Sequence, residues 1–241
     1  MNLKNLKLIS AAALVLFLVG ACIALPPSGS RRLVTETRSV SGFEALVLTG
    51  AGQLDIIQDG SESLLIETDE DTMELITTEV RDGSLYLGFD TSISFAPREV
   101  HVTLHVRSLE RIAVAGAWEI TCASLETERL EVEISGAGSL QLDDLQAEAL
   151  SAEISGAGQM EIAGRVVTQE VSISGAGRYQ AGDLQSETAS VSITGTGQAT
   201  VWVSDSLTVE TNGAGRVEYY GHPQVSSAQS GVGNIHSLGD K

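Results

Sequence analysis

The 241-residue chain is poor in aromatic residues, in cysteine and in positive charge. Aromatic side chains make up only 4% of it, so a core must be built mostly from Val, Ile, Leu and Ala. Cys22 and Cys122 are its two cysteines, too few for a framework of disulfides to support the fold. Lysine and arginine number 14 against 32 acidic residues, and the net charge of −18 would repel nucleic acid and anionic membrane surfaces. We therefore expect no nucleic-acid partner.

Proline is also scarce, with 4 residues, whereas glycine is abundant, with 25. Apolar residues reach 42%, which excludes a collagen-like or disordered chain. A chain of this length is long enough for one all-β domain or two small ones.

The first 21 residues have the pattern of an export signal. Lys4 and Lys7 precede an apolar run from Leu8 to Val19, which is too short to span a bilayer comfortably. The run ends in Leu-Val-Gly-Ala-Cys, which resembles a bacterial lipobox whose cysteine, here Cys22, is acylated and becomes the new N-terminus. The alternative is a secretory signal cut near Ala21 or Ala24, without lipid.

These signals predict the organisation of the rest of the chain. We expect a signal peptide over residues 1–21, a tether over 22–37 that holds the domain off the membrane, and a single domain over 38–241. The mature protein would be lipid-anchored at the outer face of a membrane in the bacterial cell envelope. Removal of residues 1–21 takes away two lysines and no acids, so its net charge moves from −18 to −20.

A short glycine motif repeats through the C-terminal two thirds of the chain. Six Gly-x-Gly units follow a degenerate Gly-Ala-Trp at Gly116, and successive units are 20, 20, 19, 20, 18 and 18 residues apart. So regular a step is typical of a solenoid. The glycines that we expect to form structural turns, with an earlier unit at Gly50 included, are Gly50, Gly52, Gly116, Gly136, Gly138, Gly156, Gly158, Gly175, Gly177, Gly195, Gly197, Gly213, Gly215, Gly231 and Gly233.

Apolar residues alternate with polar ones on both sides of each glycine unit. Val132 and Ile134 precede the unit at Gly136, and Leu140 and Leu142 follow it. Alternation of this kind is strand periodicity, and the glycines let the chain turn a corner between strands. The sequence therefore predicts a single-stranded parallel β-helix of about 18–20 residues per coil, right-handed by the usual crossover preference. An antiparallel sandwich would explain the alternation but not the constant step.

The N-terminal third follows this pattern less closely, because 66 residues separate Gly50 from Gly116. Between them we expect strands at Leu64–Glu67, Ser84–Phe89 and Glu99–Val106, and a helical or irregular stretch near Asp69–Leu75. They would form either wider, less regular coils or a capping layer. The C-terminal end also has the pattern of a cap, since Gln229 and Ser237 replace apolar residues of the repeat.

The serial Ser-Gly-Ala-Gly units carry a family resemblance together with three other stretches. These are Gly42-Phe43 leading into the Gly50 unit, EVRDGSLYLGF at 79–89, and VEYYGHP at 217–223. In this order they resemble the bacterial envelope family named putative auto-transporter adhesin, head GIN domain, over about residues 38–238. The resemblance implies a β-helical domain, often exported as a lipoprotein, and it offers no catalytic motif to carry over.

No stretch predicts an active site or a cofactor. Asp143-Asp144 is the only acidic pair beside a turn in the repeats, and a solvated corner explains it better than a carbohydrate-active site. Arg178 and Arg216 fall on one column two coils apart, with no acidic cluster apparent opposite. A calcium-binding roll would need an Asp in each turn, and the equivalent positions carry none.

Four further residues invite a functional interpretation. His101 and His105 share a strand face but lack an evident third metal ligand, so we expect exposed histidines and no metal. Trp118 replaces the second glycine of its unit and is expected to plug a coil, while Trp202 faces outward. Either tryptophan could instead stack on a sugar. Cys122 takes an inward position and is expected to be a small buried hydrophobe.

One outward face forms a polar wall of stacked Glu, Ser and Thr. This wall serves solubility, or it binds divalent cations, glycans or a protein partner. Its residues are Glu131, Glu133, Ser151, Glu153, Glu170, Ser172, Ser190, Ser192, Thr208 and Glu210.

The sequence therefore favours a non-catalytic structural or adhesive envelope domain. It is expected to attach to the membrane through its N-terminal lipid and to contact an envelope polysaccharide or a surface protein. A carbohydrate-active enzyme or glycan-binding module on the same scaffold is the alternative, and neither the ligand nor the oligomeric state follows from the sequence.

Overall fold

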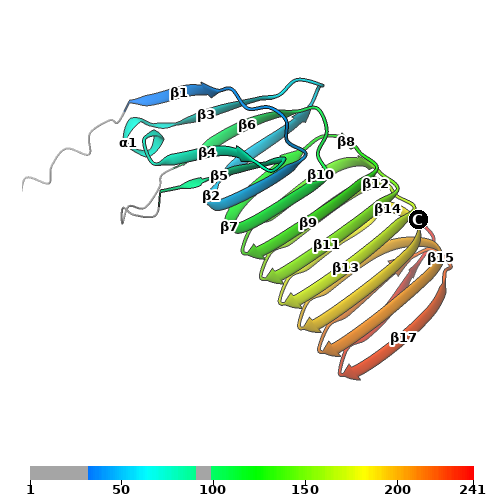
Figure 1. The fold of residues 1–241 in the computed structure, drawn as a ribbon. Helices are drawn as coiled ribbons and strands as arrows, with labels where there is room; N and C mark the ends of the chain where they lie inside the picture. Colours follow the sequence, from blue (N-terminus) through cyan, green and yellow to red (C-terminus); the bar gives the residue numbers. More distant parts are fainter. Residues whose placement is uncertain (1–31, 91–98) are drawn as a thin grey trace, which may run out of the picture. The chain divides into compact units, whose positions relative to one another are not determined.

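The computed structural model describes residues 32–90 and 99–241 (Figure 1). The predicted signal peptide, Cys22 and the first part of the predicted tether lie outside the described residues. Residues Arg32–Lys241 belong to one compact unit. Among the described residues, no helix has the length and apolar character needed to cross a bilayer.

Almost every described element is a β-strand, with one short helix near the N-terminal end. In chain order the elements are β1 (Leu33–Arg38), β2 (Ala45–Gln58), β3 (Ser63–Asp69), α1 (Glu70–Met73), β4 (Ile76–Arg81), β5 (Ser84–Phe89), β6 (His101–Val106), β7 (Arg111–Cys122), β8 (Leu125–Glu126), β9 (Arg129–Gly136), β10 (Ser139–Gln146), β11 (Ala149–Gly156), β12 (Gln159–Arg165), β13 (Thr168–Gly175), β14 (Arg178–Gly195), β15 (Gln198–Gly213), β16 (Arg216–Tyr220), β17 (Gln224–Gly231) and β18 (Asn234–Gly239).

From β7 to β18 the chain winds as a parallel β-helix, as the sequence predicts. Every pairing among these strands is parallel, and equivalent residues of successive repeats lie opposite one another. Gly136 is opposite Gly156, and Gly156 opposite Gly175. The antiparallel sandwich is therefore excluded, because it would join neighbouring strands in opposite directions.

Each coil has two long sides that meet at its glycine unit. We call the strands that end at the glycines the front sheet; these are the N-terminal half of β7, β9, β11, β13, β17 and the C-terminal halves of β14 and β15. Their arrowheads line up along one edge in Figure 1. The strands that begin after the glycines form the back sheet, which contains the C-terminal half of β7, β10, β12, β16, β18 and the N-terminal halves of β14 and β15.

The core consists of columns of like residues stacked from coil to coil. Ile134, Ile154, Ile173 and Ile193 form one such column, and all four are buried. Burial of an aliphatic side chain of this size contributes roughly 1.5–3 kcal/mol. Hence the aromatic-poor composition still gives a dense core, because the same small hydrophobe recurs in every coil.

The N-terminal third combines the two expected arrangements, a less regular layer of parallel strands and an antiparallel cap. β2 lies directly beside β7 in parallel register, with Gly50 opposite Gly116, so the intervening chain leaves the stack and returns to it. β5 and β6 pair with the two halves of β2 on its other side. β4 then adds antiparallel to β5, and β3 antiparallel to β6.

The strands and the irregular stretch expected in this region are confirmed, but the expected start of the folded domain at residue 38 is not. The predicted strands correspond to β3, β5 and β6, and the irregular stretch contains α1. However, β1 pairs antiparallel with β3 from Leu33 onward, within the residues 22–37 expected to be a tether. The folded domain therefore begins before residue 38, because β1 covers an edge that β3 would otherwise expose.

The opposite end of the stack is formed by β17 and β18. β17 pairs with β15, and β18 with β16, while no described residue pairs with the outer side of either strand. Gln229 and Ser237 lie in this last coil, opposite Thr211 and Tyr219. The predicted polar replacements thus occur where the interior of the stack meets solvent.

Candidate functional site

The two glycines of each unit occupy different environments at the corner between the sheets. The first glycine has a positive φ, 127° at Gly156, and a Cβ there would lie 2.7 Å from the carbonyl oxygen of Gly136. The second is buried with an ordinary φ, and a Cβ at Gly158 would lie 2.6 Å from Cγ2 of Ile134. The corner is therefore a site of close packing between successive coils from Gly136 to Gly231.

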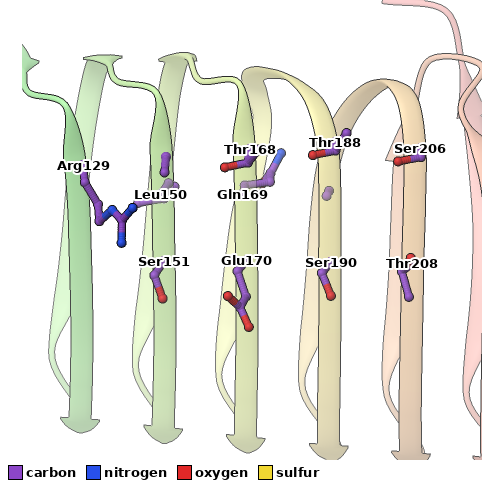
Figure 2. A pocket seen from close by; sticks show the side chains of 12 residues that line it. Arg129, Leu150, Ser151, Thr168, Gln169, Glu170, Thr188, Ser190, Ser206 and Thr208 are labelled. Carbon is purple, nitrogen blue, oxygen red and sulfur yellow. The ribbon is translucent and has the colours of Figure 1, made fainter.

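A groove with a volume of about 550 Å³ lies on the front sheet, where its strands begin. Figure 2 shows two rows of side chains that cross neighbouring strands at this point. Thr168, Thr188 and Ser206 form one row, and each lies opposite the next in register. Their hydroxyls recur at the strand spacing of about 4.8 Å.

The second row runs parallel to the first and belongs to the predicted polar wall. It contains Ser151, Glu170, Ser190 and Thr208, again in direct register. Arg129 lines the groove at the β9 end of the rows (Figure 2). The groove therefore offers one cation at its β9 end, one carboxylate on the central strand β13, and only hydroxyls from there toward β15.

The floor of the groove contains a buried polar side chain at a position that is apolar in the neighbouring coils. Gln169 takes the place of Leu150 and accepts a hydrogen bond from the Tyr179 hydroxyl at 3.1 Å. Its Nε2 donates to Ser186 Oγ at 2.7 Å, and that hydroxyl donates to the Trp202 carbonyl at 2.9 Å. Burial raises the pKa of Tyr179 well above its ordinary value, so the phenol remains a donor.

This interior chain of hydrogen bonds links the front sheet to the back sheet under the groove. Buried polar groups that are fully paired fix a local arrangement, because each lost bond would cost the desolvation of its partner. The strands carrying the hydroxyl rows are therefore held in place from beneath. The sequence does show Gln169 as a break in an apolar column, but its partners Tyr179 and Ser186 lie across the interior of the same coil, 10 and 17 residues further along the chain.

A smaller pocket, of about 270 Å³, lies on the back sheet. Asp143, Glu161 and Asp183 line it together with Tyr220 and Lys241. The Lys241 ammonium is paired with Asp183 and lies 5.1 Å from the centre of the Tyr220 ring. This group is not apparent in the sequence, since each of its five members follows a different glycine unit and only Asp143 stood out beside a turn.

The predicted acidic pair does not form a joint site. Asp143 accepts a hydrogen bond from Gln141 at 2.9 Å, and Asp144 accepts one from Gln146 at 2.6 Å. Both carboxylates are exposed, as the expected solvated corner requires. Arg178 and Arg216 are separated by one intervening strand, as predicted, and Arg216 pairs with Glu218 at 3.4 Å.

The two histidines of β6 have carboxylate partners but no third ligand. His105 Nδ1 lies 2.7 Å from Asp59 Oδ2, and His101 Nε2 lies 3.5 Å from Glu99 Oε1. Within residues 32–90 and 99–241, no cluster of three His, Cys, Asp or Glu side chains could hold a metal ion. The polar wall likewise presents no such cluster, although Glu133 and Glu153 lie opposite one another.

Arg111 compensates for part of the negative charge on this wall. Its guanidinium pairs with Glu133 at 2.9 Å and also with Glu131. These exposed pairs contribute little stability singly, but they relieve repulsion between stacked carboxylates.

Both tryptophans and Cys122 lie away from the groove. Trp118 is only 1% exposed and donates from Nε1 to the Thr49 carbonyl at 3.2 Å, so it plugs a coil as predicted and cannot stack on a ligand. Trp202 is half-buried next to Tyr220, with the Lys241 ammonium 5.8 Å from its ring. Cys122 is a free buried thiol, and burial raises its pKa to about 11.

The comparisons with known proteins agree on the fold. The model of the family described as putative auto-transporter adhesin, head GIN domain, matches residues 42–223. The crystal structure of a putative adhesin from Bacteroides fragilis is 25% identical to the chain with a TM-score of 0.83, and the match covers 87% of this chain and 98% of that one. No curated protein matches the chain.

Two further solved structures share the architecture at lower identity. A putative lipid binding protein from Parabacteroides distasonis is 20% identical with a TM-score of 0.74, and a putative adhesin from Parabacteroides merdae is 19% identical with a TM-score of 0.70. Each match covers 87% of this chain and 98% of the other. At these identities they show the fold alone.

Proposed function

Because the chain belongs to the family of putative auto-transporter adhesin, head GIN domains, we propose that it is a non-catalytic adhesive domain of the bacterial cell envelope. The groove on the front sheet is its binding surface, and an extended, neutral, polyhydroxylated polymer such as an envelope polysaccharide is its ligand. The observation that carries this proposal is the pair of hydroxyl rows in register, Thr168–Thr188–Ser206 and Ser190–Thr208.

The chemistry of the rows suits such a polymer. A hydroxyl both donates and accepts hydrogen bonds, so a ladder of hydroxyls can pair with successive sugar hydroxyls in either direction. The ladder repeats at about 4.8 Å, so a disaccharide of about 10 Å would span two coils. Arg129 at one end of the groove and Glu170 at its centre make the groove asymmetric and would fix the direction in which the chain lies.

Binding to an array of bacterial envelope polysaccharides tests this proposal. The protein would start at residue 22 with Cys22→Ala, so that no lipid adds its own affinity. The double variant Thr188→Val/Thr208→Val removes two groove hydroxyls while keeping β-branched side chains in the strands. We expect affinity to fall roughly fivefold or more for each lost hydroxyl.

Thr194→Val is the matched control. It makes the same change in the same strand as Thr188, at an exposed position outside the groove. Equal losses in the control and the groove variants would contradict the assignment of the groove. Failure of every polysaccharide to bind the unaltered protein would contradict the ligand class.

We further propose that the domain is anchored by acylation of Cys22. A chain of net charge −20 gains nothing from anionic lipid headgroups, whereas each buried CH₂ of an acyl chain contributes ~0.8 kcal/mol. Labelling cells with a fatty-acid analogue should mark the protein and leave Cys22→Ser unmarked. An exported, cleaved and unlabelled protein would favour the secretory alternative.

A carbohydrate-active enzyme is the second candidate, and the back-sheet pocket is the observation that favours it. Asp143, Glu161 and Asp183 supply the carboxylates that glycoside chemistry uses, beside the Tyr220 ring. Incubation with the same polysaccharides, followed by assay of new reducing ends, separates the candidates. Turnover abolished by Asp143→Asn would establish the enzyme, and binding without turnover would support the adhesive domain.

A further inference from the structure

The last coil of the stack presents two unpaired strand edges to solvent. β17 and β18 are each paired on one side only by described residues, and all eight residues of β17 are exposed. Half of the backbone N–H and C=O groups of these strands therefore face outward without a strand partner. Edges of this kind are templates for pairing with another chain.

The interior of the solenoid is also open at this end. Val225 lies opposite Leu207 and continues its column, and Ile235 lies opposite Val217 and continues that one. Leu207 and Val217, in the coil before, are both buried. Val225 is 42% exposed, and Val232 at the last glycine corner is 83% exposed. Apolar side chains thus accompany the free backbone groups.

Charge is absent from this coil, although the chain as a whole is strongly acidic. No Lys, Arg, Asp or Glu occurs from Tyr219 to Gly239, in a protein of net charge −18. The next charged residues, Asp240 and Lys241, follow β18, and the Lys241 ammonium is held by Asp183 on the back sheet. The open edges are therefore not masked by a charged side chain of their own.

The other end of the stack is protected in the way that natural sheets usually are. The outermost strands there are β1 and β4, which carry Glu36 and Arg38, and Glu79 and Arg81. These charges form ion pairs within each strand, at 2.8 Å between Arg38 and Glu36 and at 3.7 Å between Arg81 and Glu79. Charged edge strands disfavour pairing with a neighbour, so only the C-terminal end is suited to it.

We propose that the C-terminal coil is a dimerisation surface and that its occupant is a second copy of this chain. A two-fold axis perpendicular to the stack reverses strand direction, so β17 and β18 would meet the edge strands of the second copy antiparallel. The contact would continue both sheets, close the open interior and bury Val225 and Ile235. Two acidic copies repel over most of their surface, and this neutral coil is where they can approach.

The oligomeric state of the chain from residue 22, with Cys22→Ala to exclude lipid-driven association, tests the proposal. We expect sedimentation velocity to show a dimer whose population rises between about 1 and 100 µM. The variant Ser227→Lys/Gln229→Lys places inward-facing charges on the edge strand, a natural device against edge pairing. It should be a monomer over the same range, with an unchanged far-ultraviolet dichroism spectrum.

Ser172→Lys is the control, because it adds the same charge at an exposed position of β13 away from the end coil. It should still dimerise. A second variant, Val225→Glu, should also give a monomer. The proposal is overturned by an unaltered protein that stays monomeric, by dimers that persist in both edge variants, or by open-ended assemblies, which would indicate head-to-tail contact.

Discussion

The regular coils and the N-terminal layers achieve the same stacking by different means. From β7 onward each coil repeats its predecessor, so a glycine fits over a glycine and an isoleucine over an isoleucine. The N-terminal layers have no repeat and depend on particular side chains. Arg38 donates to the Ile76 carbonyl at 2.8 Å and to Thr78 Oγ1 at 2.7 Å, and Asp69 caps α1 by accepting from Thr72 N at 3.2 Å.

The difference shows where a repeat protein can be read from its sequence and where it cannot. In the regular coils, one glycine motif specifies both the corner and the register between neighbouring strands, so each repeat of the motif repeats both. In the layers, each junction has its own contacts, and a residue's partner can lie forty positions away, as Thr78 does from Arg38. Trp118 lies at the boundary, because it occupies a glycine position of the repeat but contacts the layer side through Thr49 and Gly52.

The largest effect should come from making this boundary conform to the repeat. Trp118→Gly restores a Gly-Ala-Gly unit, which the sequence pattern alone would favour. The structure predicts a loss of roughly 3–5 kcal/mol, because a buried indole ring leaves a cavity beside Gly52 and its bond to Thr49 is lost. Urea denaturation would measure the loss.

Trp202→Gly serves as the comparison, since this tryptophan is only half-buried on the back sheet. Its loss should be clearly smaller than that of Trp118→Gly. Equal losses of stability in the two variants, or a gain from Trp118→Gly, would show that the boundary is stabilised by the glycine repeat and not by the buried Trp118 ring.

The second largest loss of stability should come from replacing a corner glycine of the regular coils. Gly156→Ala forces an alanine to φ near 127° and puts its Cβ 2.7 Å from the Gly136 carbonyl oxygen, so we expect a loss of about 2–4 kcal/mol. Thermal and urea midpoints would both fall.

Gly60→Ala separates the two causes of that loss. Gly60 also has a positive φ, 83°, but a Cβ there meets no atom within 4 Å. This variant therefore measures the cost of a positive φ without close packing, and a clearly larger loss in Gly156→Ala would indicate that the contact with Gly136 and the φ of 127° add to that cost. If both variants lose the same free energy of unfolding, close packing of one corner on the next does not limit the stability of the regular coils.

Much of the fold could be predicted because the glycine step and the alternation of Ile and Val are local signals. They specify parallel coils, inward columns and the corners. The excursion between Gly50 and Gly116 could not be placed, since only the identity of two distant glycine units hinted that β2 and β7 are neighbours. β1 was missed because LVTETR alternates weakly and becomes a strand through pairing with β3.

The candidate groove was only partly predictable. The outward polar row was recognised from its parity, but Thr168, Thr188 and Ser206 were not. They lie where the chain enters the front sheet, at the start of β13 and within the continuous strands β14 and β15, and this point depends on the preceding corner. The Tyr179–Gln169–Ser186 chain joins residues across the interior of one coil, which composition and spacing do not reveal.

The smallest effect concerns a loop of the N-terminal layers and should appear only as a pH dependence. The Asp59 carboxylate accepts from Ser61 Oγ at 2.7 Å and Ser61 N at 3.0 Å, and it lies 2.7 Å from His105 Nδ1. The Ser61 hydrogen bonds are the largest cause, with that to His105 next, and they lower the pKa of Asp59 from 3.8 to about 2.

A carboxyl whose pKa is lower in the folded state stabilises the fold above its unfolded pKa and loses that contribution as pH falls through the folded value. The melting temperature of the native protein should therefore exceed that of Asp59→Asn by a constant amount near neutral pH. The difference should narrow between about pH 4 and pH 2. Since Ser61 is the main cause of the lowered pKa, the difference in melting temperature should still narrow when both proteins also carry His105→Gln. A difference that stays constant down to pH 2 would mean that the loop does not hold the Asp59 carboxylate as described.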